Sequence, residues 1–465
     1  MKFLHVATLA LLAGGFPLAA CAQAPAPSTF AVGTTTVTNT VLASNLEHIW
    51  ELAWGPDNFL WMTERSGRIS RVDPTTGQVL PLLTLPDVTP TGESGLLGMV
   101  LHPQFATSPY VYVVYNYSEG GALKEKLVRY TYSATAGTLS APLVLLGGIE
   151  ATTTHSGSRL VILADGTLLM STGDAQQLPE AQSMASLNGK ILRMNLDGTV
   201  PADNPTPGSR VFTLGHRNPQ GLVQLPNGRI YSSEHGPSND DEINKIEPGR
   251  NYGWPNVEGA CNLSNETAFC AANNVREPLY TWTPTIAPAG LAYYDHPAIP
   301  GWRGSLLLAV LKNNQLTQLP LNAAGLAIAG TPVNFVTTFG RLRAICVSPQ
   351  GKVYIGTSNG RASATGGNDR ILVLENTAYV ASGNRSGTSA FAFDVYPNPA
   401  RRQATVRLAA TTTRLTVRDL LGRAVLSLRP VGPTATLDLA ALRAGSYTVQ
   451  AEGPAGSATR KLVVE

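Results

Sequence analysis

Short apolar strands alternate with turns rich in Pro, Asp, Asn and Gly along most of this chain of 465 residues. In residues 52–63, for example, an apolar run enters a turn at residues 55–58 and leaves it as a second apolar run. Two such runs joined by these turn residues predict a β-hairpin. No segment has the long helical spacing of apolar residues. The pattern therefore predicts an all-β fold.

The hairpin theme occurs six times, often with a third strand after a Gly turn. A recurring unit of about four strands is typical of one blade of a β-propeller. The chain is therefore predicted to form a six-bladed β-propeller, and an array of β-sandwiches is disfavoured because the turn sequences are so similar. The six repeats begin near residues 52, 99, 160, 222, 306 and 345.

Composition divides the chain into four segments. Lys2 precedes an apolar run at residues 3–13 that is too short to span a bilayer, which predicts a signal peptide over residues 1–22 and no transmembrane span. The propeller is expected at residues 30–375. A linker rich in Ser, Gly, Asn and Thr follows at 376–392, and short alternating strands at 393–465 predict a small β-sandwich.

The cysteines carry two expectations. Leu18-Ala19-Ala20-Cys21 resembles a lipoprotein box, in which Cys21 would be lipidated, and cleavage by signal peptidase near Ala22 or Ala24 is the alternative. Cys261 and Cys270 bracket a short polar loop. In the oxidising environment of an exported protein they are predicted to form a disulfide.

The distribution of charge argues against a nucleic-acid partner. The net charge is only +3, and residues 394–465 hold ten Lys or Arg and five Asp or Glu, a net charge of +5 that leaves the rest at −2. A mildly acidic main body does not fit binding to a phosphate backbone.

Candidate chemistry gathers in residues 213–244 and in one earlier loop. Arg217 stands beside Asn218, and a planar guanidinium next to an amide suits a carboxylate or a developing oxyanion. His155 precedes a predicted strand and has small residues behind it, so it is a candidate general base. The alternatives are an arginine that ties down a loop and a surface or hydrogen-bonded histidine.

Two further groups suit ions. The stretch from Gly236 and Pro237 to Glu242 offers carbonyls and carboxylates, which are the ligands that Ca²⁺ prefers. The alternative interpretation of the same residues is a solvated acidic turn. Lys312 follows a predicted strand, and Arg341 and Arg343 stand before another. Because the three occupy successive repeats, they are expected to converge on an anionic ligand at the propeller axis rather than to act as ordinary solvated charges.

Taken together, these segments resemble the soluble glucose and aldose sugar dehydrogenases that depend on pyrroloquinoline quinone (PQQ), over roughly residues 40–375. Six ordered matches are far more specific than any single motif. The matching segments are residues 93–98 with 102–103, 155–160, 187–193, 215–220, 234–244 with 251–255, and 341–343.

The resemblance implies a six-bladed propeller that holds the quinone over its axis. In it, His155 matches the general base, which takes the proton of the sugar's anomeric hydroxyl while a hydride passes to PQQ and the lactone forms. Arg217 matches the residue that stabilises the quinone oxygen beside the reacting carbon. The positions that match cofactor-binding residues are Arg217, Asn218, Lys312, Arg341 and Arg343.

The resemblance also implies two calcium sites. The carbonyls of Gly236 and Pro237 match ligands of the Ca²⁺ that polarises the quinone. Glu242 and the carbonyl of Tyr252 match ligands of a second, structural Ca²⁺.

The sugar-contacting positions depart from the glucose-oxidising pattern. Glu93, a substrate-binding position, stands where those members often have Gln. Other departures are Thr154 and Ser183 at positions where Asp is common, His235 for a usual Gln, and Ala344 where Asp is frequent. The resemblance therefore implies an aldose or oligosaccharide substrate without specifying glucose.

The tail resembles the C-terminal sorting domain of type IX secretion cargo. The segments that carry this resemblance are residues 396–399, 419–423, 442–447 and 461–465. They imply Sec export, passage across the outer membrane by the type IX machinery, and a secreted or cell-surface location. This favours cleavage of the signal peptide over lipidation.

The main prediction is thus a secreted quinoprotein that oxidises the anomeric carbon of an aldose and passes electrons to an unknown acceptor. The alternative is a non-catalytic propeller that binds glycan or protein, but the presence of both His155 and Arg217 favours the enzyme. A metal-dependent lactonase on a similar propeller would need carboxylates at the axis where this chain has cations.

Overall fold

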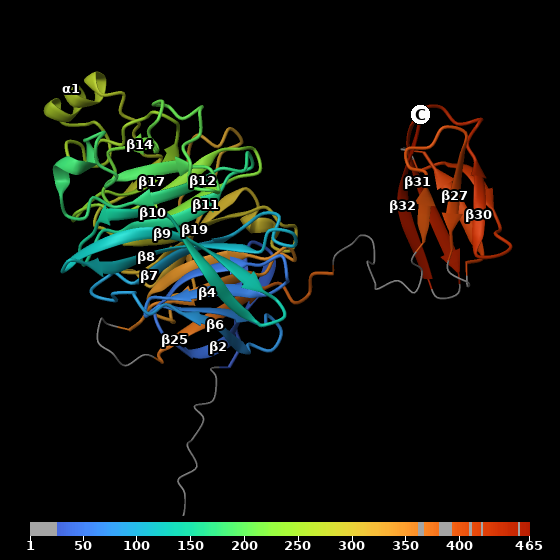
Figure 1. Ribbon diagram of the computed structural model, residues 1–465, viewed down its shortest axis with the longest axis horizontal. Helices are drawn as coiled ribbons and strands as arrows, with labels where there is room; N and C mark the ends of the chain where they lie inside the picture. The colour runs from blue at the N-terminus through green and yellow to red at the C-terminus, as the bar shows by residue number, and fades with distance from the viewer. Residues whose placement is uncertain (1–25, 361–366, 381–392, 409–411, 420–421, 454–455) are drawn as a thin grey trace, which may run out of the picture. The chain divides into compact units, whose positions relative to one another are not determined.

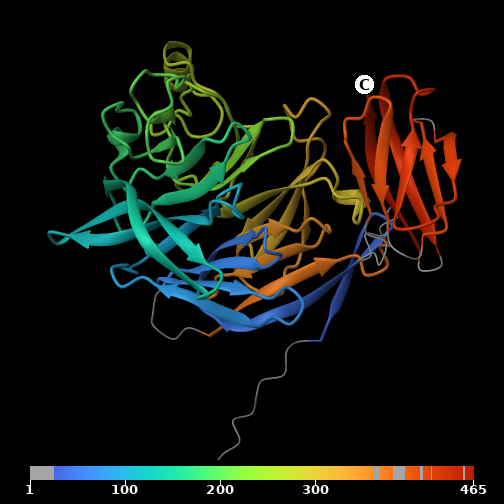
Figure 2. The same cartoon turned by 45° about the vertical axis from the view of Figure 1, so that its right-hand side comes forward.

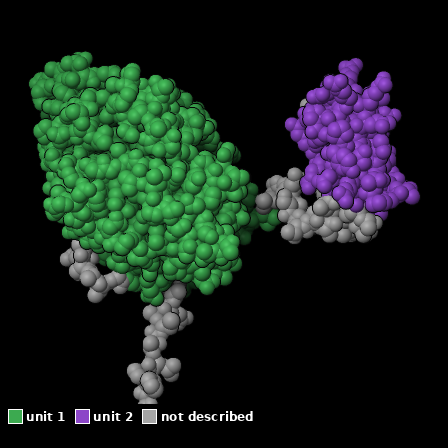
Figure 3. Space-filling view, in the orientation of Figure 1, with its two compact units in different colours: residues 1–380 green, residues 381–465 purple. Residues whose placement is uncertain are grey.

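A computed structural model describes residues 26–360, 367–380, 393–408, 412–419, 422–453 and 456–465. The chain divides into two compact units, Met1–Val380 and Ala381–Glu465 (Figure 3). The expected signal peptide with Cys21 lies outside the described residues, as does most of the expected linker at 376–392.

The first unit contains six antiparallel sheets among its described residues, and each of the six hairpin repeats lies in a different sheet. Five sheets have four strands in sequence order. They are β3 (Ile49–Trp54), β4 (Leu60–Glu64), β5 (Arg68–Val72) and β6 (Val79–Thr84); β7 (Leu96–Leu101), β8 (Tyr110–Glu119), β9 (Ala122–Ser133) and β10 (Thr138–Glu150); β11 (Gly157–Ile162), β12 (Leu168–Thr172), β13 (Lys190–Met194) and β14 (Val211–Leu214); β15 (Pro219–Gln224), β16 (Ile230–Glu234), β17 (Asp241–Ile246) and β18 (Tyr280–Trp282); and β19 (Pro288–Tyr294), β20 (Ser305–Val310), β21 (Gln315–Pro320) and β22 (Val333–Phe335).

The sixth sheet joins the two ends of the first unit. Its order is β1 (Ser28–Val32), β2 (Thr35–Leu46), β25 (Asp369–Glu375), β24 (Val353–Thr357) and β23 (Leu342–Val347). Strand β2 pairs with β25 from Thr38 opposite Glu375 to Leu46 opposite Asp369. Strands β1 and β2 were not predicted from the sequence; the many Thr and Asn residues of β2 obscure its alternation of apolar and polar positions.

The contacts between neighbouring sheets arrange the six sheets in a closed ring. Figures 1 and 2 show the first unit in two orientations. One strand of each sheet lies beside its counterpart in the next sheet, in the order β3, β7, β11, β15, β19 and β23, and β23 lies beside β3. These are called the first strands, so that in the sixth sheet β23 is the first strand and β24 the second. Apolar side chains fill the spaces between neighbouring sheets; one cluster, for example, unites Trp61 and Ile69 of one sheet with Val113 and Val128 of the next.

The second strands of the sheets are packed on both faces. Every residue of β4, β12, β16 and β24 is buried. A strand covered on both sides has no solvent face, which explains why apolar residues stand at successive positions at the start of each of these segments. Their last residues include the buried polar side chains Glu64, Thr172, Glu234 and Thr357.

Antiparallel pairing brings two loops of each sheet to one edge. Pro219 at the start of β15 pairs with Glu234 at the end of β16, and Gly157 of β11 pairs with Thr172 of β12 in the same way. The loop before each first strand therefore meets the loop after each second strand at one end of the ring. Most of the predicted site residues occupy these loops, whereas Arg343 lies in β23, Glu242 in β17 and Tyr252 between β17 and β18.

A single α-helix occurs in the described part of the chain, α1 (Ser264–Ala272), between β17 and β18. Two 3-10 turns, Leu178–Ala181 and Pro300–Trp302, complete the helical elements there. The predicted disulfide Cys261–Cys270 is confirmed and ties the segment before α1 to the helix, with 6.4 Å between the Cα atoms. None of the described helices has the length and apolar character needed to cross a membrane.

The second unit contains two sheets among its described residues. One has the order β26 (Asp394–Tyr396), β27 (Gln403–Arg407) and β30 (Thr434–Asp438), and the other β29 (Ala424–Leu428), β28 (Arg414–Arg418), β31 (Gly445–Gly453) and β32 (Gly456–Val464). Val406 and Leu437 of the first sheet belong to the same buried cluster as Val417 and Val449 of the second. The unit therefore has a core of its own.

Candidate active site

His155 lies before β11 and is held by a buried carboxylate. Its Nδ1 is 2.8 Å from Oδ1 of Asp174, which follows β12 at the same edge of the sheet. The histidine side chain is 17% exposed and the aspartate side chain is fully buried. Because a carboxylate accepts the hydrogen bond, the proton of the neutral imidazole resides on Nδ1. Nε2 is left with a free lone pair, as a general base requires.

Asp174 is itself fixed by two further donors. The Trp254 indole N–H donates to its Oδ2 at 2.8 Å, and the Gln176 backbone N–H donates to Oδ1 at 2.8 Å. The Arg217 carbonyl accepts a hydrogen bond from the Asp174 backbone N–H. Asp174 therefore joins the His155 loop to the Arg217 loop of the neighbouring sheet.

Arg217 and Asn218 lie before β15 and have donors without partners. The Arg217 guanidinium lies 5.3 Å from the centre of a Trp254 ring and donates from Nη1 to the His235 carbonyl at 3.2 Å, while its Nε is buried and unpaired. The Asn218 Nδ2 is also buried and unpaired. Buried polar groups normally find partners. These two donors therefore indicate a position where a ligand would complete the hydrogen bonding.

His235 and Glu93 lie close to His155, and His235 also lies close to Arg217. Burial lowers the pKa of His235 to about 4, the neighbouring Arg343, Arg217 and His155 act in the same direction, and Glu93 opposes them. The imidazole is therefore uncharged at neutral pH, and its buried Nε2 lacks a partner. Glu93 Oε2 accepts the His155 backbone N–H at 3.3 Å. The structure thus brings predicted residues from three sheets together.

A cavity of about 410 Å³ adjoins Glu93 and is lined by arginines. Burial and repulsion from neighbouring arginines lower the pKa of Arg343 to about 10 against the attraction of Glu93. Arg343 donates to the Gln220 side chain at 2.8 Å. Such a concentration of partly buried cations favours an anionic ligand. The lining residues are His48, Trp50, Arg65, Gly92, Glu93, Arg341, Arg343, Ser358, Asn359 and Gly360.

Lys312 lies apart from that cavity. It is exposed after β20, and its ammonium group donates to Thr285 Oγ1 at 2.9 Å. Its charge acts on Asp241, whose carboxylate accepts the backbone N–H groups of Gly236, Ile286 and Ala287. Of the predicted cations, Arg341 and Arg343 line the large cavity and Lys312 is beside the Gly236 loop.

The four predicted calcium-binding residues line a second, small cavity of about 20 Å³. Gly236, Pro237, Glu242 and Tyr252 surround it together with Glu234. Burial raises the pKa of Glu242 well above its usual range, and the neighbouring charge of Glu234 raises it further. A bound cation would relieve this unfavourable environment. Among the described residues, no group of three or more His, Cys, Asp or Glu side chains is arranged to hold a metal ion.

A buried carboxyl lies behind the His155 loop. Glu125 of β9 accepts the Ser158 hydroxyl at 2.7 Å and the Asn116 amide at 3.3 Å. Burial raises the pKa of Glu125 to about 8, although these two hydrogen bonds lower it. Ser158 has a positive φ of 70°, which non-glycine residues adopt only where their surroundings hold them.

Replacing Glu125 with Gln is expected to change how stability depends on pH. The folded carboxyl keeps its proton up to about pH 8, whereas the unfolded one loses it above about 4.5. The stability of the native protein therefore falls as pH rises through this window. E125Q cannot ionise, so its melting temperature relative to the wild type should rise between pH 5 and pH 8.5. A difference that does not vary with pH contradicts the assignment, and exposed Glu119→Gln is the control.

Sequence reasoning missed several groups at this end of the ring. Asp174, Glu234 and Arg65 were not singled out, although Glu234, like Trp254, was noted within a matching segment. A usable signal existed for the first three, because each stands at or just after the end of a second strand. That position lies beside the loop before the first strand of the same sheet.

Comparisons with known proteins place the chain among the sugar dehydrogenases, which are oxidoreductases. The sequence model of the family described as glucose/sorbosone dehydrogenase matches residues 46–365, so the chain belongs to that family. The predicted membership is confirmed. The quinoprotein glucose dehydrogenase B of Acinetobacter calcoaceticus is 33% identical over 398 residues, with coverage of 67% of this chain and 83% of the relative.

Solved structures of sugar dehydrogenases are also similar to this chain. The PQQ-bound aldose sugar dehydrogenase from Streptomyces coelicolor has 35% sequence identity and a TM-score of 0.64, with coverage of 75% of this chain and 99% of that chain. The apo form of the soluble aldose sugar dehydrogenase from Escherichia coli has 28% identity and a TM-score of 0.65, with coverage of 73% and 99%.

The tail has its own match. The family described as a secretion system C-terminal sorting domain matches residues 394–465, which confirms the predicted sorting domain.

Proposed function

We propose that the first unit is a six-bladed β-propeller, with each of its six sheets as one blade, and that the two sheets of the second unit pack as a sandwich. The ring order of the first strands supports the propeller. The single buried cluster shared by the two sheets supports the sandwich.

We propose that this propeller oxidises the anomeric carbon of an aldose or oligosaccharide to a lactone with PQQ as cofactor. The observation that carries the proposal is the fixed imidazole of His155 beside the unpaired donors of Arg217, Asn218 and His235 and the arginine-lined cavity.

The residues present fit a quinone with several carboxylates. Arg341 and Arg343 stand in the cavity with no carboxylate partner within ion-pair distance among the described residues. Together with Arg217, Asn218 and Lys312, they would bind the cofactor's anionic groups. Bound PQQ would supply the acceptor for the hydride from the anomeric carbon.

The protein's own groups would carry the proton and position the sugar. His155 Nε2 would accept the anomeric hydroxyl proton, and Asp174 would stabilise the imidazolium that forms. Arg217 would place its positive charge near the oxygen on which negative charge develops. Glu93 is close enough to His155 to accept a hydroxyl of the same sugar.

The small cavity suits a cation with oxygen ligands. We propose that the carbonyls of Gly236 and Pro237 hold a Ca²⁺ next to the quinone, and that Glu242 with the carbonyl of Tyr252 holds a second one. The raised pKa of Glu242 supports a site that awaits a positive charge.

The sorting domain supports export by the type IX secretion machinery to the outside or the surface of the cell. We propose that the protein first leaves the cytoplasm by the Sec route. Its electron acceptor would then be met outside the cytoplasm.

Reconstitution of the metal-stripped protein tests the function. Addition of PQQ with Ca²⁺ is expected to give micromolar or tighter quinone binding and dye reduction with a panel of aldoses and oligosaccharides. PQQ added with EDTA should give much less activity. If quinone does not bind, the fold serves as a non-catalytic binding propeller and the proposal is wrong.

A further inference from the structure

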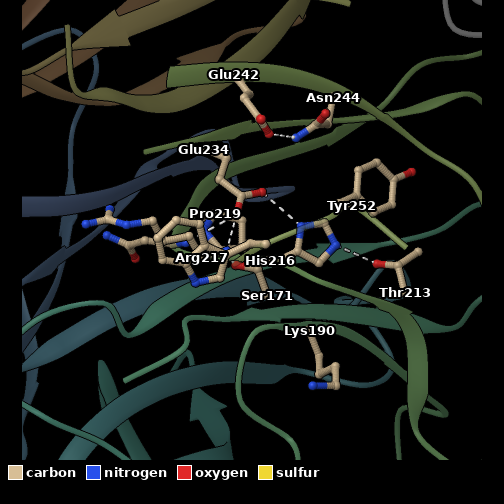
Figure 4. A network of polar contacts seen from close by, with 12 residues as sticks. Ser171, Lys190, Thr213, His216, Arg217, Pro219, Glu234, Glu242, Asn244 and Tyr252 are labelled. Carbon is tan, nitrogen blue, oxygen red and sulfur yellow. Dashed lines mark hydrogen bonds and ion pairs between the residues drawn. The ribbon is translucent and has the colours of Figure 1, made fainter. Parts of the chain in front are cut away.

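His216, which precedes Arg217 in the same loop, forms a buried pair with Glu234, and neither has a role in the reaction described so far (Figure 4). His216 Nδ1 lies 2.9 Å from Glu234 Oε2. The imidazole is fully buried and the carboxylate nearly so. A buried charged group of this kind is costly unless it is fully hydrogen-bonded.

One carboxylate holds three consecutive residues. Glu234 Oε1 accepts the backbone N–H of Arg217 and, at 3.3 Å, that of Asn218, while Oε2 accepts from His216. Glu64 has a similar position in another sheet, where its carboxylate accepts a hydrogen bond from the Glu47 backbone N–H at 2.8 Å and forms an ion pair with Arg68. The carboxylate at the end of a second strand thus fixes the loop before the first strand in both sheets.

His216 is held on its other sides as well. Its Nε2 is 2.8 Å from the Thr213 hydroxyl, and its ring stacks on Tyr252 with 4.6 Å between ring centres. The Tyr252 hydroxyl is anchored by the Lys245 carbonyl at 2.6 Å. The direction of the His216 N–H towards Glu234 is therefore determined by the surrounding protein.

The side chain of Arg217 has little of its own to fix it. Its guanidinium makes one hydrogen bond, to the His235 carbonyl, and rests against Trp254. Its placement consequently depends on the backbone that Glu234 holds. The negative charge of Glu234 also favours the charged form of Arg217, whose pKa burial lowers.

We propose that His216 is a positioning residue for Arg217 and Asn218: it orients Glu234, which fixes the backbone from which both side chains reach the reacting groups. This inference rests on the proposed function for its catalytic consequence. Its structural part, the order of the 216–218 backbone, is independent of the cofactor.

Two substitutions separate the hydrogen bond from the ring. His216→Phe keeps a ring against Tyr252 and removes the donor to Glu234. His216→Asn removes the ring and keeps an N–H close to the position of Nδ1. If His216 merely fills space, H216F should be the milder change, whereas the positioning role requires that H216N be the milder one.

The expected result is that H216F binds PQQ about tenfold or more weakly, the order expected for loss of one hydrogen bond to a buried charge. Its kcat at saturating PQQ should fall with little change in the KM for the sugar. Hydrogen exchange in the metal-stripped protein should show faster exchange of the Arg217 and Asn218 amides in H216F than in H216N. Arg303→Leu, which removes the partner of the exposed Asp295 after the end of β19, is the control and should leave all three quantities unchanged.

Unaltered exchange at residues 217 and 218 in H216F overturns the proposal, as does a greater loss of PQQ affinity in H216N than in H216F. If H216F does not fold, Thr213→Val removes the other partner of the imidazole, and unaltered exchange in that variant overturns it equally. Failure of the wild type to bind PQQ would instead contradict the proposed function, and the exchange measurements would still decide the positioning role.

Discussion

Replacing His155 with Gln is expected to lower turnover by about 10²–10⁴-fold, the range expected for loss of a general base. Glutamine has no basic lone pair near neutral pH, so the anomeric hydroxyl would have to release its proton without assistance. The groups proposed to bind the quinone are untouched. The affinity for PQQ should therefore stay close to that of the wild type.

The measurement is a single turnover followed through the quinone absorbance after addition of sugar. His296 packs against Tyr379 away from the site residues, so His296→Gln is the matched control and should react at the wild-type rate. Rapid reduction of PQQ in H155Q would show that the base is another residue.

Asp174→Asn is expected to have an effect of similar size. The two oxygens of Asp174 accept from His155 and Gln176 on one side and from Trp254 on the other. In either orientation of the asparagine amide, its NH₂ group would face one of these hydrogen-bond donors. The uncharged amide also cannot stabilise the imidazolium of His155. We expect kcat to fall by about 10²–10⁴-fold with a small change in the KM for the sugar.

Asp165→Asn is the control for this variant because Asp165 occupies the β11–β12 turn at the other end of the same sheet, where it pairs with Arg193. That change should leave kcat unaltered. Wild-type kcat in D174N would mean that His155 acts without the carboxylate, whatever the change in stability.

The strands that carry the site could be predicted from sequence because each hairpin has a clear apolar pattern and a Gly-containing turn. Pro226-Asn227-Gly228, for instance, marks the turn between β15 and β16. Once this hairpin is recognised, Arg217 and His235 must lie at the same edge. The resemblance to sugar dehydrogenases then supplied roles that hairpin patterns cannot provide.

Other features were beyond the sequence for physical reasons. The place of Asp174 and Glu234 at strand ends was a usable signal, but their hydrogen bonds with the His155 and His216 side chains and with backbone N–H groups leave no mark in the periodicity of the chain. Every residue has a backbone carbonyl, so the proposed use of the Gly236 and Pro237 carbonyls as calcium ligands cannot be predicted from side-chain type. That Gly236, Pro237, Glu242 and Tyr252 surround one small cavity could be seen only in the three-dimensional structure.

The pairing of β2 with β25 means that the ring of sheets can close only late in synthesis of the chain. Thr38 emerges from the ribosome early, and its partner Glu375 is made only after the other five sheets. The ring consequently stays open through nearly the whole of translation, and pairing between such distant residues is intrinsically slow. An export signal is predicted at residues 1–22. Because the ring closes late, the translocation machinery would have a long time to bind the chain while it is still unfolded.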